Sequence, residues 1–346
     1  LSIMLLISTW TTHDMSLSLE KISGTILGLG VFFAVVRQAY RPLNWFFIYA
    51  FFLGAGVTVA VAGLFGIQWP PPERFSFLSP LINRIPRLLR GLPGAEAGLQ
   101  HNAVGGTLLW VLPSLLSLSV LLLINPRHVN HSSSFFFSTD CNLLQNPFRI
   151  RVVKLVVWFS ALFVSVVFIL TQSRSSYLAM GFTCIAILFL VLPARWRWVL
   201  FISLLGFVIV LMLALYQIGG WNGLVDSLEI SDHSGLSTRT LKIRREIWAH
   251  AIYLIQDFPL LGIGMNTFRE KVHKIYPLSL SPPNVDIAHA HNEYLQVALD
   301  LGIPGLIAFL AIHIIAFWML VDIWKASSDS LLEFPQSQPP THNLQI

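Results

Sequence analysis

Two histidines, His289 and His291, lie in the segment HAHNEY at residues 289–294 and could take part in acid–base chemistry. A neutral imidazole accepts a proton near neutral pH because its ordinary pKa is about 6.5. Histidines at this spacing could also bind a metal, but no third ligand follows at a typical spacing, and we expect no metal site. We therefore expect a general base in this segment, with a structural histidine as the alternative.

Arginines that could bind an anion occur in two other places. Arg174 lies in the polar break TQSRSS, residues 171–176, between two apolar runs. A second basic group opens the helix predicted over residues 240–257 and consists of Arg239, Lys242, Arg244 and Arg245. Positive charge is unfavourable at a helix N-terminus, whereas a phosphate would bind both to arginines and to the free N–H groups there.

Each of these arginine groups also has a simpler interpretation. Arg174 could anchor the chain among lipid headgroups, because long basic side chains extend to the membrane surface. The second group could be a solvated face in which Glu246 pairs with its neighbours. The residues alone leave both alternatives open.

The composition indicates that these groups belong to a membrane protein. Of 346 residues, 55% are hydrophobic and 11% are charged, against roughly 25% charged in an ordinary soluble domain. This excludes a soluble globular enzyme. The net charge of +5 is typical of basic cytoplasmic loops, and we expect no nucleic-acid partner. The two cysteines form no CxxC pair and predict neither a disulfide framework nor a metal site.

Several apolar runs approach the roughly 20 residues that a helix needs to cross a bilayer. A shorter run at residues 22–36 and an apolar stub at Leu1, which we expect to be a truncated first helix, bring the total to about eight segments. The predicted fold class is therefore all-α, a polytopic transmembrane bundle with a partly helical external cap. The remaining runs are residues 43–67, 103–124, 155–172, 177–193, 198–218 and 303–321.

The basic connections between these runs orient them in the membrane. We expect seven transmembrane helices in residues 1–218, a large external loop at 219–290, the last transmembrane helix at 291–325 and a disordered cytoplasmic tail at 326–346. The loop contains the predicted cap helix, residues 240–257. The GIG sequence at residues 262–264 lacks the context of a dinucleotide-binding loop and predicts only a turn. The apolar face of the cap helix consists of Ile247, Ala251, Leu254 and Ile255.

Four stretches of this sequence closely resemble the O-antigen ligase and polymerase family. In chain order they are GLQHNAVGGTLLWVLP, TQSRSS, RREIWAHAIYLIQDFPLLGIGMNTF and HAHNEYLQVALDLGIPGLIAFL. The resemblance runs from about Gly94 to Trp324 and combines ordered motifs with a large external loop.

The resemblance implies a membrane glycosyltransferase without a cofactor. Such enzymes move a glycan from an undecaprenyl-diphosphate carrier to an acceptor sugar, lipid or protein at the external face of the bacterial inner membrane. It also implies that Arg174 and Arg244 bind the diphosphate and that His291 activates the acceptor hydroxyl. Arginines that neutralise the leaving group would make a metal unnecessary, and a base on the opposite side would give inversion.

Other residues near these motifs would contribute to substrate binding. Arg239 and Arg245 are alternatives for the arginine of the loop. Trp248 and Tyr294 could stack on sugars, although aromatic residues also form belts at membrane interfaces. The remaining candidates are Asn102 and Asn292.

Two other classes of function remain open. Some relatives with the same loop have been labelled putative bicarbonate transporters, so a transporter of a small anion is the main alternative. The sequence lacks the repeat and the matched broken helices that are typical of secondary transporters. A structural or assembly protein, with the cap as a docking surface, is the third hypothesis. Within the glycosyltransferase class, a ligase and a polymerase differ in acceptor, and the sequence favours neither.

Overall fold

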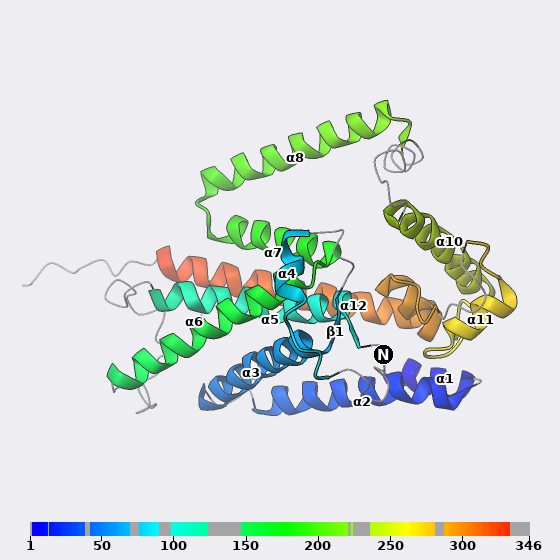
Figure 1. Cartoon of the computed structure of the whole chain (residues 1–346), viewed down its shortest axis with the longest axis horizontal. Helices are drawn as coiled ribbons and strands as arrows, with labels where there is room; N and C mark the ends of the chain where they lie inside the picture. The colour runs from blue at the N-terminus through cyan, green and yellow to red at the C-terminus, as the bar shows by residue number, and fades with distance from the viewer. Residues whose placement is uncertain are drawn as a thin grey trace, which may run out of the picture. The chain divides into compact units, whose positions relative to one another are not determined.

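A computed structural model describes most of the chain, and Figure 1 shows its helices in chain order. The described residues are 2–12, 14–38, 42–69, 76–89, 98–123, 147–220, 223, 236–280 and 287–332. The longer helices are α1 (Ser2–Thr11), α2 (Met15–Gln38), α3 (Pro42–Gly66), α5 (His101–Leu123), α6 (Pro147–Leu170), α7 (Arg174–Val191), α8 (Ala194–Gln217), α10 (Leu236–Asp257), α11 (Phe268–Ile275) and α12 (Glu293–Leu332).

Short elements connect α3 to α5. A 3-10 turn, η1 (Ser76–Leu78), precedes α4 (Ser79–Ile82). The strands β1 (Ile67–Gln68) and β2 (Leu99–Gln100) pair in parallel, with Ile67 opposite Leu99. This pair joins the end of α3 to the start of α5.

Seven helices of the described chain are long and apolar enough to cross a membrane. The predicted all-α polytopic fold is therefore confirmed. The apolar stub at the N-terminus forms α1, which has 10 residues and is shorter than a span. The candidate spans are 15–38, 45–66, 101–123, 150–170, 174–191, 195–217 and 293–326.

Most of these spans begin earlier than the sequence predicted, and two of them begin much earlier. Helix α2 begins at Met15, because the carboxylate of Asp14 accepts a hydrogen bond from the Ser16 N–H at 2.9 Å and caps the helix. Helix α12 begins at Glu293 and continues through a kink at Gly302. The hydrophobic runs at residues 22–36 and 303–321 are therefore only the most apolar parts of longer helices.

The chain forms two compact units, of which one comprises residues 31–210. Its core lies between α3, α5 and α6 and includes the buried Leu108, Leu115 and Val164. Gly56 on α3 allows close approach to α5, because a Cβ atom there would lie 2.5 Å from a Val111 methyl group. Small residues serve this purpose in many membrane helix pairs.

The other unit comprises residues 1–30 and 211–346. Its core contains Ile247, Ala251 and Leu254 of α10 together with Phe268 of α11 and Leu299 of α12, all fully buried. The predicted apolar face of the cap helix is confirmed by this packing, with Ile255 partly buried at its edge. The helix itself begins at Leu236, four residues before the predicted start, and ends at Asp257.

Backbone contacts join the loop after α10 to the kink of α12. The Ile263 N–H donates to the Leu299 carbonyl at 2.6 Å, and the Ile303 N–H donates to the Pro259 carbonyl at 2.7 Å. Gly302 has φ 70°, and a Cβ atom there would lie 2.4 Å from the Leu260 carbonyl oxygen. The GIG sequence thus forms the predicted turn, and it also approaches α12 closely, which the sequence did not indicate.

Candidate functional site

The segment before α12 holds His291 in a left-handed conformation. Its φ is 52°, a value that costs a non-glycine residue free energy unless the surroundings impose it. The next residue, Asn292, caps the helix: its Oδ1 atom accepts hydrogen bonds from the Tyr294 N–H at 3.0 Å and the Leu295 N–H at 3.3 Å. The chain therefore turns sharply at His291, a residue that keeps part of its surface accessible to solvent.

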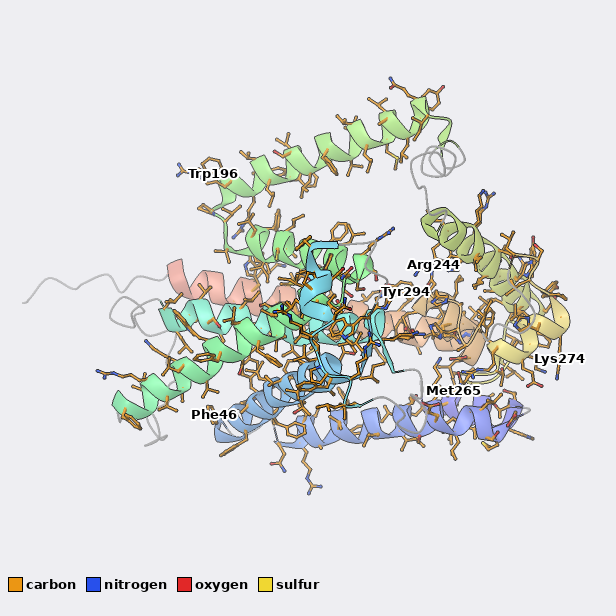
Figure 2. The ribbon with its side chains drawn as sticks, in the orientation of Figure 1. Phe46, Trp196, Arg244, Met265, Lys274 and Tyr294 are labelled. Atoms are coloured by element: carbon orange, nitrogen blue, oxygen red, sulfur yellow. The ribbon has the colours of Figure 1, made fainter. Side chains whose placement is uncertain are left out.

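Helix α10 lies against this segment through Trp248. The indole Nε1–H donates to the Ala290 carbonyl at 2.9 Å, and Ala290 is fully buried. Arg244 lies one turn before Trp248 on the same face of α10. Figure 2 labels Arg244 on α10 and Tyr294 in the first turn of α12. The structure thus brings together the predicted Arg244, Trp248 and His291.

The surroundings keep the His291 imidazole neutral. Partial burial of the ring, together with its electrostatic interactions with His289 and Arg244, lowers its pKa from 6.5 to about 4. The two histidine rings lie edge to face, with centroids 4.6 Å apart. At neutral pH the imidazole is therefore in the form that can accept a proton, and its role as a base stays a prediction.

Arg244 forms no ion pair within the described part of the chain. The nearby carboxylate, Glu246, instead accepts hydrogen bonds from the Ser279 hydroxyl at 2.6 Å and the Leu280 N–H at 3.0 Å. Burial raises the pKa of Glu246, but the hydrogen bonds from Ser279 and Leu280 outweigh burial and hold the pKa below its ordinary value. The guanidinium of Arg244 is thus available for an anion.

One part of the prediction for the basic group is wrong. Because α10 begins at Leu236, Arg244 lies more than two turns inside the helix. Arg244 is therefore not among the first-turn residues, whose N–H groups are free at the helix end. Arg245 is exposed on α10, and the side chain of Arg239 lies outside the described residues.

Arg174 lies in the unit of residues 31–210, as the first residue of α7. Gln172 before it is buried and has φ 51°. Ser173 caps the helix, since its Oγ atom accepts a hydrogen bond from the Ser176 N–H at 3.4 Å. The predicted polar break is therefore a capped turn that exposes the arginine.

Asn102 lies in the first turn of α5, at the same end of this unit as Arg174. One turn after it, Gly105 packs on the polar turn, because a Cβ atom there would lie 2.8 Å from the Ser176 Oγ atom and 3.0 Å from the Thr171 Oγ1 atom. Asn102 itself is exposed. The structure thus brings Asn102 and Arg174 to one end of this unit.

Sequence reasoning missed two polar residues of α12. Gln296 and Asp300 are both buried, and Gln296 hydrogen bonds to the Ala290 N–H. An amide and a carboxylate four residues apart in an apolar helix could have identified them, because polar groups inside membrane segments are costly. Among the residues with described placement, no group of three or more His, Cys, Asp or Glu could hold a metal ion.

The comparisons with known proteins concern the same region. Residues 159–310 match the family model described as O-antigen ligase. This range contains Arg174, Arg244 and His291, whereas Asn102 lies before it. No curated protein sequence and no solved structure matches the chain significantly. Residues 159–310 are therefore similar to the O-antigen ligase family.

Proposed function

We propose that this protein transfers a glycan from an undecaprenyl-diphosphate-linked donor to a hydroxyl group of an acceptor sugar, lipid or protein. The similarity of residues 159–310 to the O-antigen ligase family supports glycan transfer of the O-antigen ligase or polymerase type, and the seven candidate spans support a multi-pass membrane protein. The donor, the acceptor hydroxyl and a site at the external face of the bacterial inner membrane belong to the proposal. The observation that carries it is the exposed, neutral His291 beside Arg244.

In this proposal, His291 takes the proton of the acceptor hydroxyl. The acceptor oxygen then forms a bond to the anomeric carbon, and the bond from that carbon to the diphosphate oxygen breaks. The diphosphate leaves with the electron pair, and direct displacement inverts the anomeric configuration. Neutral imidazole is the form that can accept the proton, which agrees with the lowered pKa of His291.

The arginines would stabilise the leaving group. Arg244 and Arg174 would each donate hydrogen bonds to diphosphate oxygens, where charge develops in the transition state. Arg174 is exposed at the start of α7, where free N–H groups also favour an anion. With two guanidinium groups on the diphosphate, the reaction would need neither a metal nor an acid on the leaving group.

The aromatic side chains would bind the glycan. Trp248 is 39% exposed and Tyr294 is 56% exposed, so each could offer a ring face to a sugar. Asn292 would act mainly by holding the first turn of α12, because its side-chain oxygen already accepts two backbone hydrogen bonds. We retain Arg239, Arg245 and Asn102 as candidates for contacts with the donor.

The direct test is a transfer assay with the full-length protein in liposomes. The liposomes would contain an undecaprenyl-diphosphate-linked glycan and candidate acceptors, with EDTA present. We expect the acceptor to gain the glycan with inverted anomeric configuration, as NMR of the product would determine. Absence of transfer with every acceptor, together with bicarbonate uptake that requires Arg174, would contradict the proposal and favour the anion transporter.

A further inference from the structure

Side chains from two helices form hydrogen bonds with the N–H and the carbonyl of the residue before His291. The Ala290 N–H donates to the Gln296 Oε1 atom at 2.9 Å, and the Ala290 carbonyl accepts from the Trp248 indole at 2.9 Å. Ala290 is fully buried, so water does not replace these partners. The main chain is therefore fixed at the residue before His291.

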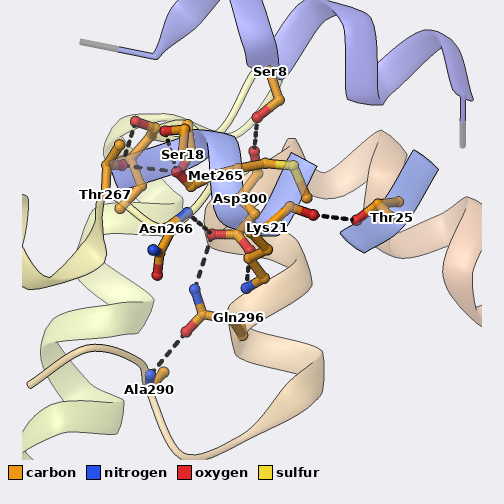
Figure 3. Close-up of polar contacts among 12 residues, drawn as sticks. Ser8, Ser18, Lys21, Thr25, Met265, Asn266, Thr267, Ala290, Gln296 and Asp300 are labelled. Atoms are coloured by element: carbon orange, nitrogen blue, oxygen red, sulfur yellow. Dashed lines mark hydrogen bonds and ion pairs between the residues drawn. The ribbon is translucent and has the colours of Figure 1, made fainter. Parts of the chain in front are cut away.

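Gln296 is in turn held by Asp300, one turn further along α12. The Gln296 Nε2 atom donates to the Asp300 Oδ1 atom at 2.9 Å, and both side chains are buried. Lys21 of α2 contributes an ion pair at 2.5 Å to the other carboxylate oxygen. The Asn266 N–H donates to Oδ1 at 3.3 Å. Figure 3 shows these contacts as a continuous series from Lys21 to Ala290.

This series explains how His291 can keep its conformation. A left-handed φ of 52° is unfavourable for histidine and persists only where neighbouring contacts impose it. Hydrogen bonds in a buried environment are stronger than in water, and each polar group left without a partner there is costly. A rotation at residues 290–291 would separate Ala290 from both Gln296 and Trp248.

We propose that Gln296 is a positioning residue for His291, and that Asp300 and Lys21 hold Gln296 in place. The inference rests on the proposed role of His291 as a base. Gln296 itself touches no reacting atom; it fixes the backbone from which the imidazole reaches the acceptor hydroxyl. Small displacements of a catalytic group can cost about 100-fold in rate.

The first test replaces Gln296 with alanine. We expect Gln296→Ala to lower kcat about 100-fold while the KM for the donor changes little, because the diphosphate contacts remain. The matched control is Gln256→Ala, since Gln256 is exposed on α10 of the same unit. It should keep the wild-type kcat. Circular dichroism and size exclusion in detergent would verify that each variant is folded.

The second readout does not depend on activity. NMR of histidine-labelled protein would follow the titration of His291, which lies beside His289 and Glu293 in sequence and faces Arg244 of α10. We expect its pKa to rise toward 6.5 in Gln296→Ala, because the released ring becomes more hydrated. If the wild-type protein transfers no glycan, the proposed function fails, and this titration still tests the positioning role.

An exchange of the amide and the carboxylate tests the hydrogen bonds themselves. Gln296→Glu places two carboxylates together, and Asp300→Asn removes the partner of Lys21. The double variant restores one carboxylate and one amide, so the Ala290 N–H keeps an acceptor. We expect it to exceed the slower single variant in kcat by about tenfold.

Two results would overturn the inference. One is a folded Gln296→Ala protein with wild-type kcat and an unchanged His291 titration. The other is a double variant no faster than the slower single variant. This result would mean that the hydrogen bonds from Lys21 to Ala290 do not position His291.

Discussion

Two turns in different units of the molecule have the same local design. In each, a residue with left-handed φ precedes a capping residue and then a helix. Gln172 (φ 51°) and Ser173 precede α7, and His291 (φ 52°) and Asn292 precede α12. The α7 turn presents Arg174 as its first helical residue, whereas the α12 turn presents the left-handed residue itself.

The two turns differ in what holds them. Hydroxyl groups of neighbouring residues hold the α7 turn, as in the 2.8 Å contact between Ser173 Oγ and Ser176 Oγ. Residues far apart in the chain hold the α12 turn, since Trp248 binds Ala290 and Lys21 binds Asp300. A local turn is enough to expose a cation, which tolerates some movement. A base that must meet one proton needs a more rigid frame.

Replacement of either histidine by alanine tests the role of the α12 turn, and His291→Ala should give the largest effect of all the variants. We expect His291→Ala to lower the rate of glycan transfer by about 100-fold to 10,000-fold, because a general base contributes that much. The matched variant is His289→Ala, which removes a ring 4.6 Å away but no proposed base. It should lower the rate less than tenfold. Equal losses in the two variants would contradict the assignment.

Replacement of Arg174 tests the exposed cation of the α7 turn. We expect Arg174→Ala to lower kcat about 100-fold, as when a donor to a developing negative charge is removed. Arg174→Lys should recover only part of the loss, because an ammonium group cannot bind two oxygens in parallel. Full recovery with lysine would show that the charge alone matters. An unchanged rate in Arg174→Ala would exclude Arg174 from the reaction.

Glycine substitutions would compare the rigidity of the α12 kink with that of the α7 turn. Gly302→Ala, at the kink of α12, should lower the free energy of unfolding by about 3 kcal/mol, because alanine disfavours φ 70° and ψ 179° and its Cβ atom would meet the Leu260 carbonyl. Gly105→Ala, beside the α7 turn, should cost about 1 kcal/mol, since hydroxyl groups there can move.

Reversible unfolding in mixed micelles would measure both changes. Gly28→Ala in α2 is the control, because a Cβ atom there meets open space and alanine favours a helix. A larger loss for Gly105→Ala than for Gly302→Ala would reverse the comparison.

The caps should give the smallest effects. Ser173→Ala and Asn292→Ala each remove a side-chain acceptor from a helix start, and each should cost about 1 kcal/mol in the free energy of unfolding. Only Asn292→Ala should also slow transfer, because the cap follows His291 directly. Similar rates for both variants would show that the α12 turn is as tolerant as the α7 turn.

The structural features that the sequence predicted are those that depend on local or periodic sequence patterns. Runs of apolar residues predicted the spans, and the 3.6-residue period predicted the buried face of α10. The polar break TQSRSS predicted the turn at Arg174. These patterns depend on residues within a few positions of one another.

The parts that it missed depend on contacts between distant segments. No pattern in the sequence indicates that Gln296 would bind the Ala290 amide, or that Lys21 and Asp300, 279 residues apart, would form an ion pair. The close approach of Gly302 to Leu260 also joins distant segments, and no sequence pattern indicates it. Helix propensity and hydrophobic periodicity do not predict such contacts, because these contacts depend on tertiary packing.

The role of His291 as a neutral base can be tested by the pH dependence of kcat/KM for the acceptor. With a folded-state pKa of about 4 for His291, the imidazole stays neutral as the pH falls from 7.5 to 5. The unfolded chain takes up the proton near pH 6.5, so the free energy of unfolding decreases as the pH falls from 6.5 toward 4. The folded fraction must therefore be measured at each pH. We predict a constant kcat/KM between pH 7.5 and 5 and a decline below pH 5, whereas a tenfold decline between pH 7 and 5.5 would contradict a neutral His291 base.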